Sequence, residues 1–206
     1  MQPRKLVSFW NGKVTWLERL CVHPMLGTGH DVEVFTSEPV KLKLELDCKI
    51  RDVQEVMQEN TLGELYKKRG WFAFYADMVR LELLRRNLGT WSDLDCLFLR
   101  PLDLDEEYVF GLCDEKRVNN AILHLPFDCE MLNDYHAAVN TMPLRAPWAT
   151  NHIKIRRNIE IFFGQQIPTN PTKMAIGPRA LSWFLKKHAL LHHAKELPVF
   201  LSLIHI

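Results

Sequence analysis

Residues 5–36 read KLVSFWNGKVTWLERLCVHPMLGTGHDVEVFT, and this stretch decides the fold. Residues 5–10 have the apolar and aromatic composition of a β-strand, and the turn pair Asn11-Gly12 ends it. Residues 16–25 repeat apolar side chains at three- and four-residue spacing, which predicts a short helix. Residues 31–36 alternate polar and apolar residues, which predicts a second strand. Strand, helix and strand in this order form the βαβ unit of a parallel sheet.

The same kind of pattern continues downstream. Residues 71–87 carry a wide apolar stripe that predicts a helix, and Gly89 stands where a C-cap glycine belongs. Residues 94–99 are a short apolar run stopped by Pro101, which predicts a buried strand. Weaker patterns predict a strand or edge hairpin at 40–50 and a strand at 120–125. Residues 51–69 are expected to form helix and loop, and 102–110 an exposed acidic loop. Further helices are predicted at 129–142 and 179–190.

The composition is that of one soluble globular domain. The chain has 206 residues, of which 47 % are hydrophobic and 25 % charged. This length suffices for one core and is too short for two full domains, so residues 1–200 are expected to form a single domain. Residues 201–206 resemble translated sequencing-adapter sequence and are interpreted as a non-native tail. The net charge of +1 gives no strongly basic face, so no nucleic-acid partner is expected.

The cysteine pattern favours a cytoplasmic protein with reduced thiols. The five cysteines are odd in number, widely spaced and contain no Cys-x-x-Cys pair, which argues against a structural zinc site. The N-terminus does not resemble a signal peptide, and no apolar run approaches the roughly 18 residues of a membrane span.

The residues with the clearest chemical meaning lie between positions 76 and 95. Asp77 and Arg80 are three residues apart and therefore share one face of the predicted helix. Asp93 and Asp95 are two apart, so in an extended segment both carboxylates point the same way. The two negative charges repel each other unless a bound cation offsets them. Mg²⁺ typically binds one or two carboxylates together with water and phosphate oxygens. The pair therefore predicts a metal site that holds a diphosphate.

A second Asp-x-Asp triplet is present at residues 103–105. It follows Pro101 and continues into Glu106 and Glu107, so a solvated acidic loop explains it. The first triplet differs because it follows a helix with Asp and Arg and a glycine turn.

This context resembles the sugar-binding, DXD-containing glycosyltransferases of the GT-A type, a family 32-like group. The resemblance rests on Ala76-Asp77-x-x-Arg80, Gly89 and Asp93-x-Asp95. The group includes yeast α-mannosyltransferases and the glucosylating domains of large clostridial toxins, and bacterial members linked to polysaccharide synthesis are the most similar. Residues 7–10, 119–122 and 176–181 also resemble family segments. The family commonly has glycine and an apolar residue where Leu88 and Ser92 stand here, and its members continue further, so this chain is expected to be truncated at its C-terminus.

The resemblance implies a GT-A-like α/β fold with a mostly parallel central sheet flanked by helices. It implies that Asp93 and Asp95 bind Mn²⁺ or Mg²⁺, with Asp95 as the direct ligand and Asp93 also near the ribose. Asp77 and Arg80 would contact the sugar or orient the donor, and Trp10 would stack on the base. The remaining donor-site residues would be Asn120, Gly177 and Pro178.

The implied reaction is metal-dependent, retaining hexosyl transfer from a nucleotide-diphosphate sugar, with a UDP-sugar preferred over a GDP-sugar. The acceptor would be a saccharide or glycolipid of polysaccharide or lipopolysaccharide synthesis. One alternative is a truncated, catalytically inactive nucleotide-sugar-binding relative. Another is a phosphatase of the haloacid dehalogenase type, but there the Asp pair follows an apolar strand, whereas here residues 94–99 come after it. Residues 67–75, basic and then aromatic, could contact the inner face of the membrane, but a solvated basic turn that leads into a buried aromatic helix start is the favoured interpretation.

Several of these residues also have an ordinary structural interpretation. Trp10 could be a core aromatic, and Arg80 could form a weak surface pair with Asp77 or Glu82. Asn119 and Asn120 could be turn residues, and Gly177-Pro178 a turn before a helix. The histidines His188, His192 and His193 are interpreted as helix-end side chains rather than a zinc site.

Overall fold

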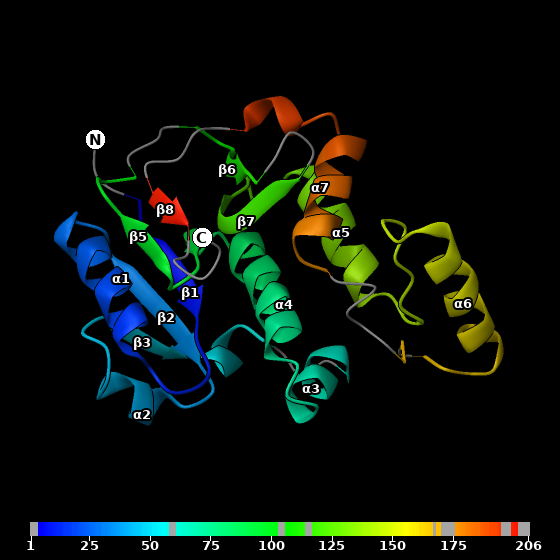
Figure 1. Cartoon of the computed structure of the whole chain (residues 1–206), viewed down its shortest axis with the longest axis horizontal. Coiled ribbons are helices and arrows are strands. Elements are labelled where there is room, and N and C mark those ends of the chain that lie inside the picture. The colour runs from blue at the N-terminus through cyan, green and yellow to red at the C-terminus, as the bar shows by residue number, and fades with distance from the viewer. Residues whose placement is uncertain are drawn as a thin grey trace.

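The computed structural model describes residues 4–57, 61–102, 106–113, 117–166, 168–169, 176–194 and 199–201. The strands of the central sheet are β1 (Leu6–Phe9), β2 (Val32–Thr36), β3 (Lys49–Asp52), β4 (Thr90–Ser92), β6 (Val109–Leu112) and β7 (Val118–His124). They lie in the order β3-β2-β1-β4-β7-β6 (Figure 1). The pairs β3-β2, β2-β1 and β1-β4 are parallel, whereas β7 is antiparallel to both β4 and β6. The expected α/β arrangement with a mostly parallel sheet is confirmed.

The first βαβ unit is also confirmed. Helix α1 (Trp16–Gly27) connects β1 to β2, and Thr15 caps its first turn. The Thr15 side-chain oxygen accepts a hydrogen bond from the Leu17 amide at 3.2 Å, while Glu18 accepts one from the Thr15 amide at 2.6 Å. This reciprocal capping box satisfies two amides that the helix itself leaves free, and so fixes where the helix begins.

Two apolar cores lie on opposite faces of the sheet. One holds Val7 and Phe35 and is covered by α4 (Phe72–Arg85), α5 (Glu130–Asn140) and α7 (Pro178–Lys187). The other holds Leu6 and Val34 and is covered by α1 and α2 (Pro39–Lys43). Neighbouring residues of one strand thus enter different cores, because side chains alternate across a strand.

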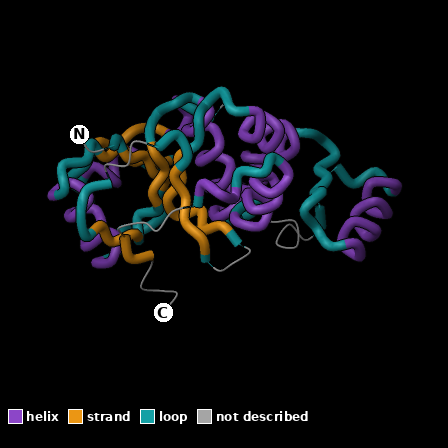
Figure 2. Tube along the Cα trace, turned by 90° about the horizontal axis from the view of Figure 1, so that it is seen from above, coloured by secondary structure: helices purple, strands orange, loops and turns teal. Residues whose placement is uncertain are grey.

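The remaining elements lie around this centre. Helix α3 (Thr61–Lys68) packs against α4, and α6 (Asn151–Phe162) stands apart from the sheet at one end of the molecule (Figure 2). A separate two-stranded sheet pairs β5 (Cys96–Phe98) with β8 (Val199–Leu201), and short 3-10 helices occupy Val53–Glu55 and Leu191–His193. In the part of the chain that the structure describes, no helix is long and apolar enough to cross a membrane.

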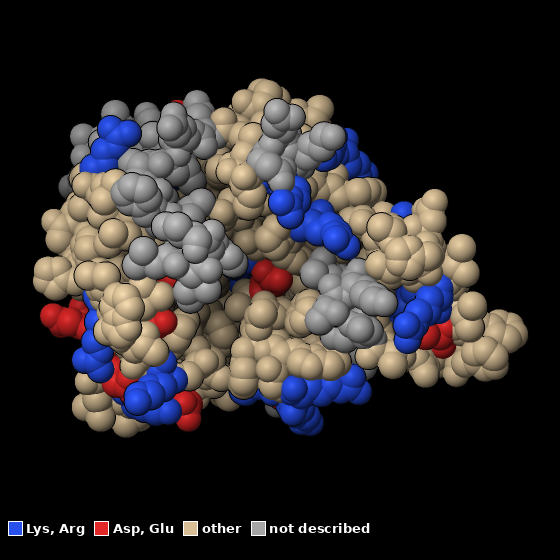
Figure 3. Space-filling model, viewed as in Figure 1, with Lys and Arg blue, Asp and Glu red and all other residues tan. Residues whose placement is uncertain are grey.

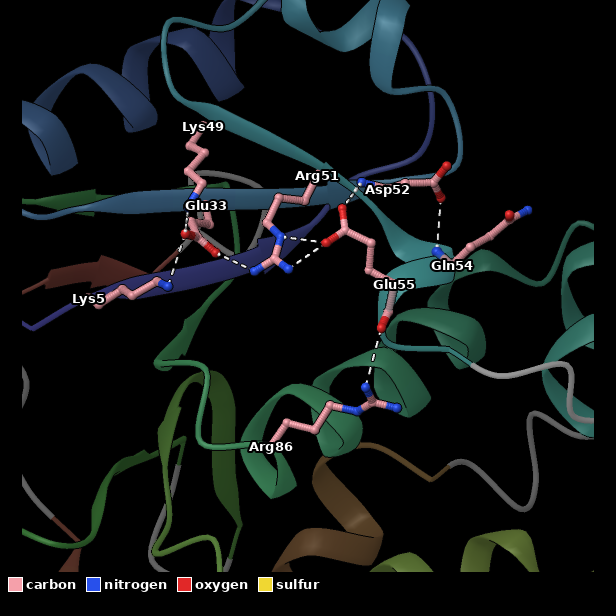
Figure 4. A network of polar contacts seen from close by, with 8 residues as sticks. All are labelled: Lys5, Glu33, Lys49, Arg51, Asp52, Gln54, Glu55 and Arg86. Atoms are coloured by element: carbon pink, nitrogen blue, oxygen red, sulfur yellow. Dashed lines mark hydrogen bonds and ion pairs between the residues drawn. The ribbon is translucent and has the colours of Figure 1, made fainter.

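An ion-pair network ties β1, β2 and β3 together (Figure 4). Glu33 is buried, and its carboxylate accepts hydrogen bonds from Lys49, from Arg51 at 3.1 Å and from Lys5 at 2.9 Å. Arg51 also binds Glu55. Burial alone would raise the pKa of Glu33, but the bonds from Lys49, Lys5 and Arg51 outweigh it and hold the pKa at about 2.

Gly89 is not the C-cap glycine that the sequence predicts. Helix α4 ends at Arg85, and Asn87 adopts the left-handed conformation with φ 51°. Gly89 has φ 153° and lies against β1, where an added Cβ would meet the Lys5 carbonyl oxygen at 2.8 Å. The glycine is needed because the loop passes too close to β1 for a side chain.

The strand predicted at 94–99 is found at residues 96–98, as β5 of the small sheet. A strand that was not predicted, β4 of the central sheet, precedes Asp93. Because strands lie on both sides of the aspartate pair, the position of the apolar run does not argue against a phosphatase.

Other sequence predictions also need correction. Residues 40–50 form α2 and a turn before β3 rather than one strand or a hairpin, and 102–110 include the start of β6, with Val109 and Phe110 fully buried. Helix α6 was not predicted at all. Asn119 and Asn120 lie in β7 and not in a turn. The triplet at 103–105 and residues 202–206 lie outside the described residues.

Candidate functional site

A cavity of about 430 Å³ opens where β1 and β4 end, between α4 and the beginning of α7. Its volume is in the range of small-molecule sites, and open α/β sheets bind ligands at the carboxyl ends of their parallel strands. Its walls combine aromatic residues with a small number of polar ones. The lining residues are Phe9, Trp10, Asn11, Phe72, Ala73, Ala76, Asp77, Arg80, Trp91, Asp93, Leu94, Asp95, Asn120 and Pro178.

Arg80 joins two carboxylates of this cavity. Its side chain is 8 % exposed, and its two terminal nitrogens donate separately, Nη1 to Asp77 Oδ1 and Nη2 to Asp93 Oδ1 at 3.0 Å. The guanidinium also lies over the Trp91 ring, with Cζ 4.4 Å from the ring centroid. The alternative of a surface pair is wrong, because Arg80 is buried and links α4 to the turn after β4.

Asp77 is held from three elements. Besides Arg80 on its own helix, Asn120 Nδ2 on β7 donates to its Oδ1 at 3.3 Å. Gly177 at the start of α7 lies so close that an added Cβ would be 2.7 Å from Asp77 Oδ2. Burial raises the pKa of Asp77 above its usual range, and Arg80 opposes this effect while Asp93 adds to it. The Gly177-Pro178 pair is thus both the start of a helix and a wall of the site.

Asp93 and Asp95 have different surroundings. Residues 93–96 form a turn, closed by a hydrogen bond from the Cys96 amide to the Asp93 carbonyl at 3.3 Å, so the expected extended segment is wrong. Asp93 Oδ1 accepts from Trp91 Nε1 at 2.7 Å as well as from Arg80, yet 33 % of its side chain stays exposed to the cavity. Asp95 makes no hydrogen bond or ion pair with the described parts of the chain, although it lines the same cavity.

The charges of the cavity do not balance. Three carboxylates, those of Asp77, Asp93 and Asp95, face one guanidinium, that of Arg80, so the fully ionised site carries two net negative charges. Burial and the neighbouring Asp95 raise the pKa of Asp93, which Arg80 and Trp91 only partly oppose. A divalent cation would supply the missing charge.

The donor set fits a metal that is shared with a ligand. Among the described residues, no group of three or more His, Cys, Asp or Glu side chains could hold a metal ion, and the three C-terminal histidines form no such group. A cation here would take at most Asp93 and Asp95 from the protein. That number suits Mg²⁺ or Mn²⁺ completed by water and phosphate oxygens and does not suit a closed structural zinc site.

Polar atoms without partners mark another wall of the cavity. Trp10 Nε1 and Asn11 Oδ1 are buried and have no hydrogen-bond partner in the described structure, and the same holds for Arg80 Nε. Leaving such an atom unsatisfied costs about 1–3 kcal/mol. Trp10 is half-buried, so it is neither a full core residue nor a free surface one.

The structure brings the predicted donor-site residues together. Trp10, Asp77, Arg80, Asp93, Asp95, Asn120 and Pro178 line one cavity, and Gly177 abuts Asp77. Sequence reasoning missed Trp91, which orients Asp93 and stacks on Arg80, and Asn11, which was interpreted only as a turn residue. The signal for Trp91 was its position two residues before Asp93, because a buried indole N–H usually finds an acceptor.

Comparisons with known proteins support the fold. No family model matches the chain, and no curated protein matches it. Among solved structures, 34 chains match. One is the PaToxG glycosyltransferase, which aligns with a TM-score of 0.63 at 13 % identity over 91 % of this chain and 70 % of its own. At this identity the likeness shows a shared fold, so the GT-A-like α/β fold expected from the sequence is confirmed.

Proposed function

We propose that the chain is a metal-dependent glycosyltransferase that moves a hexose from a nucleotide-diphosphate sugar to a saccharide or glycolipid acceptor. The observation that carries this proposal is the cavity in which Asp77, Asp93 and Asp95 face Arg80 as the one cationic side chain among the described lining residues. It lies at the strand ends of a fold shared with a solved glycosyltransferase. An excess of two carboxylates is what a diphosphate with a divalent metal requires.

Each end of the cavity suits a different part of the donor. Asp95 is the available carboxylate and would bind Mn²⁺ or Mg²⁺ with the exposed part of Asp93. The Trp10 ring would stack on the base, with Asn11 beside it in the cavity wall. Asp77, fixed by Arg80 and Asn120, would accept hydrogen bonds from the sugar hydroxyls.

The reaction exchanges one bond at the anomeric carbon. The bond to the diphosphate oxygen breaks, the acceptor oxygen bonds to the same carbon, and the acceptor proton is released. When bound, the metal would neutralise the diphosphate, whose negative charge grows as it leaves. We propose retention of configuration and a UDP-sugar donor, in line with the sequence resemblance, with a GDP-sugar as the alternative.

Calorimetric titration of UDP and GDP, with and without Mn²⁺, tests the proposal. UDP should bind only with Mn²⁺, and Asp95→Asn should weaken this binding by more than about tenfold, since it removes a charged ligand. The matched control is Asp105→Asn in the second triplet, which should bind like the wild type. Equal losses in the two variants, or binding that ignores Mn²⁺, would overturn the proposed metal site.

A binding protein without turnover is the second candidate. Arg80 already donates a hydrogen bond to one carboxylate oxygen of Asp77 and to one of Asp93. This fixed arrangement favours a site that holds a donor rigidly. Metal-dependent binding of UDP without release of UDP from UDP-glucose or UDP-galactose would select this candidate. Release of phosphate from p-nitrophenyl phosphate, lost in Asp93→Asn, would instead select the phosphatase.

A further inference from the structure

Helix α6 exposes a stripe of large apolar side chains. Ile155, Ile159, Phe162 and Phe163 are 62 %, 54 %, 83 % and 75 % exposed. Ile155, Ile159 and Phe162 are four and three residues apart and so lie on one side of the helix, and Phe163 directly follows the end of the helix. The helix lies at one end of the molecule, away from the sheet and from the candidate site (Figure 1). The stripe, defined as these four residues, is therefore open to a partner.

The outward orientation of the stripe is fixed by the opposite face of the helix. There Arg157 is 3 % exposed, and its guanidinium donates to the carbonyls of Leu144 at 2.9 Å, Gln165 at 3.0 Å and Gln166. It also pairs with Glu160. Four bonds from one buried side chain hold the helix against the flanking loops, so α6 cannot turn its apolar side inward without leaving a buried charge unpaired.

Basic residues surround the stripe. In helical projection, Lys154 lies on one side of it and Arg156 on the other. Residues 141–166 contain four Lys or Arg side chains and one carboxylate, Glu160, a net charge of +3, although the whole chain carries only +1. Glu160 pairs with Arg156 at 3.4 Å and with the buried Arg157, so two cations share one carboxylate. The lobe at the right of Figure 3 accordingly shows Lys and Arg atoms beside a broad region without charge. Positive charge is thus concentrated where the apolar stripe is exposed.

We propose that this face of α6 docks on an anionic lipid surface. The four apolar side chains would enter the boundary between headgroups and acyl chains, and Lys154 and Arg156 would contact headgroup phosphates, as in interfacial amphipathic helices. The proposal does not depend on the proposed function.

Two observations disfavour a second copy of the chain as the occupant. Two lobes of net charge +3 repel each other. The four side chains, at roughly 150 Å² each, also fall short of the ~800 Å² per partner of a stable interface.

The basic and aromatic residues 67–75 are a poorer membrane surface. Tyr75 is buried, Trp71 packs against the core, and Arg69 lies 4.9 Å from the centre of the Trp71 ring. Of the aromatic side chains in this segment, Phe72 is the exposed one, at 38 %, and it lines the candidate cavity.

Flotation with vesicles tests the proposal. The full chain should bind vesicles of phosphatidylcholine mixed with phosphatidylglycerol and should bind phosphatidylcholine alone much more weakly. Phe162→Ser with Phe163→Ser should reduce partitioning by roughly a hundredfold, about tenfold per lost ring. Lys154→Gln with Arg156→Gln should reduce it about tenfold or more, and only on the anionic vesicles.

The matched control uses exposed apolar residues elsewhere. Val40 and Leu44 on and after α2 are 79 % and 85 % exposed, and Val40→Ser with Leu44→Ser should bind vesicles like the wild type. Wild-type binding to both vesicle types alike, equal loss in the control, or no loss in the phenylalanine variant would overturn the proposal. A dimer in solution that the phenylalanine variant converts to a monomer would identify a second copy as the occupant instead. Every variant should keep its Mn²⁺-dependent binding of UDP, which separates this result from the fate of the proposed function.

Discussion

The substitution Gly177→Ala tests how tightly Asp77 is held in the cavity. The new Cβ would lie 2.7 Å from Asp77 Oδ2 and 3.0 Å from Oδ1, closer than such contacts occur in folded proteins. The carboxylate cannot simply move away, because Arg80 and Asn120 hold Oδ1. On the other side, the Tyr135 hydroxyl donates to the carbonyl of Ile176 next to the glycine. The methyl group therefore displaces Asp77 or shifts the start of α7.

The expected cost is that of one hydrogen bond between charged groups. Such bonds contribute about 1.5–3 kcal/mol, so the free energy of unfolding should fall by about 2 kcal/mol.

A double-mutant cycle in urea separates this clash from other effects. We compare the wild type, Gly177→Ala, Asp77→Ala and the double variant, and we expect a coupling of about 2 kcal/mol because the methyl group has room once the carboxylate is gone. Gly27→Ala is the matched control, since an added Cβ there meets nothing within 4 Å, and it should change stability by less than about 0.5 kcal/mol. If Gly177→Ala costs as much without Asp77 as with it, the carboxylate is not the obstacle and our reasoning about this wall fails.

Two further predictions concern the frame that supports the site. Glu33→Gln should destabilise the fold by about 2 kcal/mol at neutral pH, because the folded pKa of about 2 lies below the usual 4.5. This contribution is present above the unfolded pKa and is lost as the pH falls toward 2, so urea midpoints of the two proteins should converge between about pH 4.5 and 2, and a constant difference would contradict it. Gly89→Ala should lower the free energy of unfolding by more than about 2 kcal/mol, because its Cβ meets the Lys5 backbone at 2.8 Å and its φ is strained for alanine; stability equal to that of Gly27→Ala would argue against this close contact.

The sequence predicts those elements whose burial follows a simple period. Helices α1 and α4 are of this kind, because each has a regular apolar face. Strands β1 and β2 were also predicted, although every residue in them is buried, Glu33 and Thr36 included. Strand β4 escaped prediction because it has three residues, and two of them, Thr90 and Ser92, are polar. Both are 1 % exposed because neighbouring strands and helices enclose them. The sequence of so short a segment does not indicate which elements will pack around it.

Helix α6 escaped prediction for a different reason. Its polarity is inverted, with Arg157 facing the protein and Ile155, Ile159 and Phe162 facing outward. The carbonyls that make Arg157 favourable inside belong to loop residues on either side of the helix. No periodicity records those bonds, so the apolar pattern could not be assigned to a buried or an exposed face.

The sequence predicted which residues line the candidate site better than it predicted the hydrogen bonds between them. The spacing of Asp77 and Arg80 placed both on one face of a helix, as found. The bond from Arg80 to Asp93 depends on the packing of α4 beside β4, and that from Asn120 depends on β7 running antiparallel to β4. Both are properties of the assembled sheet.

The charge balance of the cavity links these connections to the proposed cofactor. Arg80 is the one Lys or Arg among the cavity-lining residues that the structure describes, and both of its terminal nitrogens are bound to carboxylates. Its positive charge is therefore already balanced and cannot also neutralise a diphosphate. Asp95 adds a further negative charge that no described residue pairs with. A diphosphate entering this cavity by itself would meet net repulsion from the described side chains, and the divalent metal that we propose would offset this repulsion.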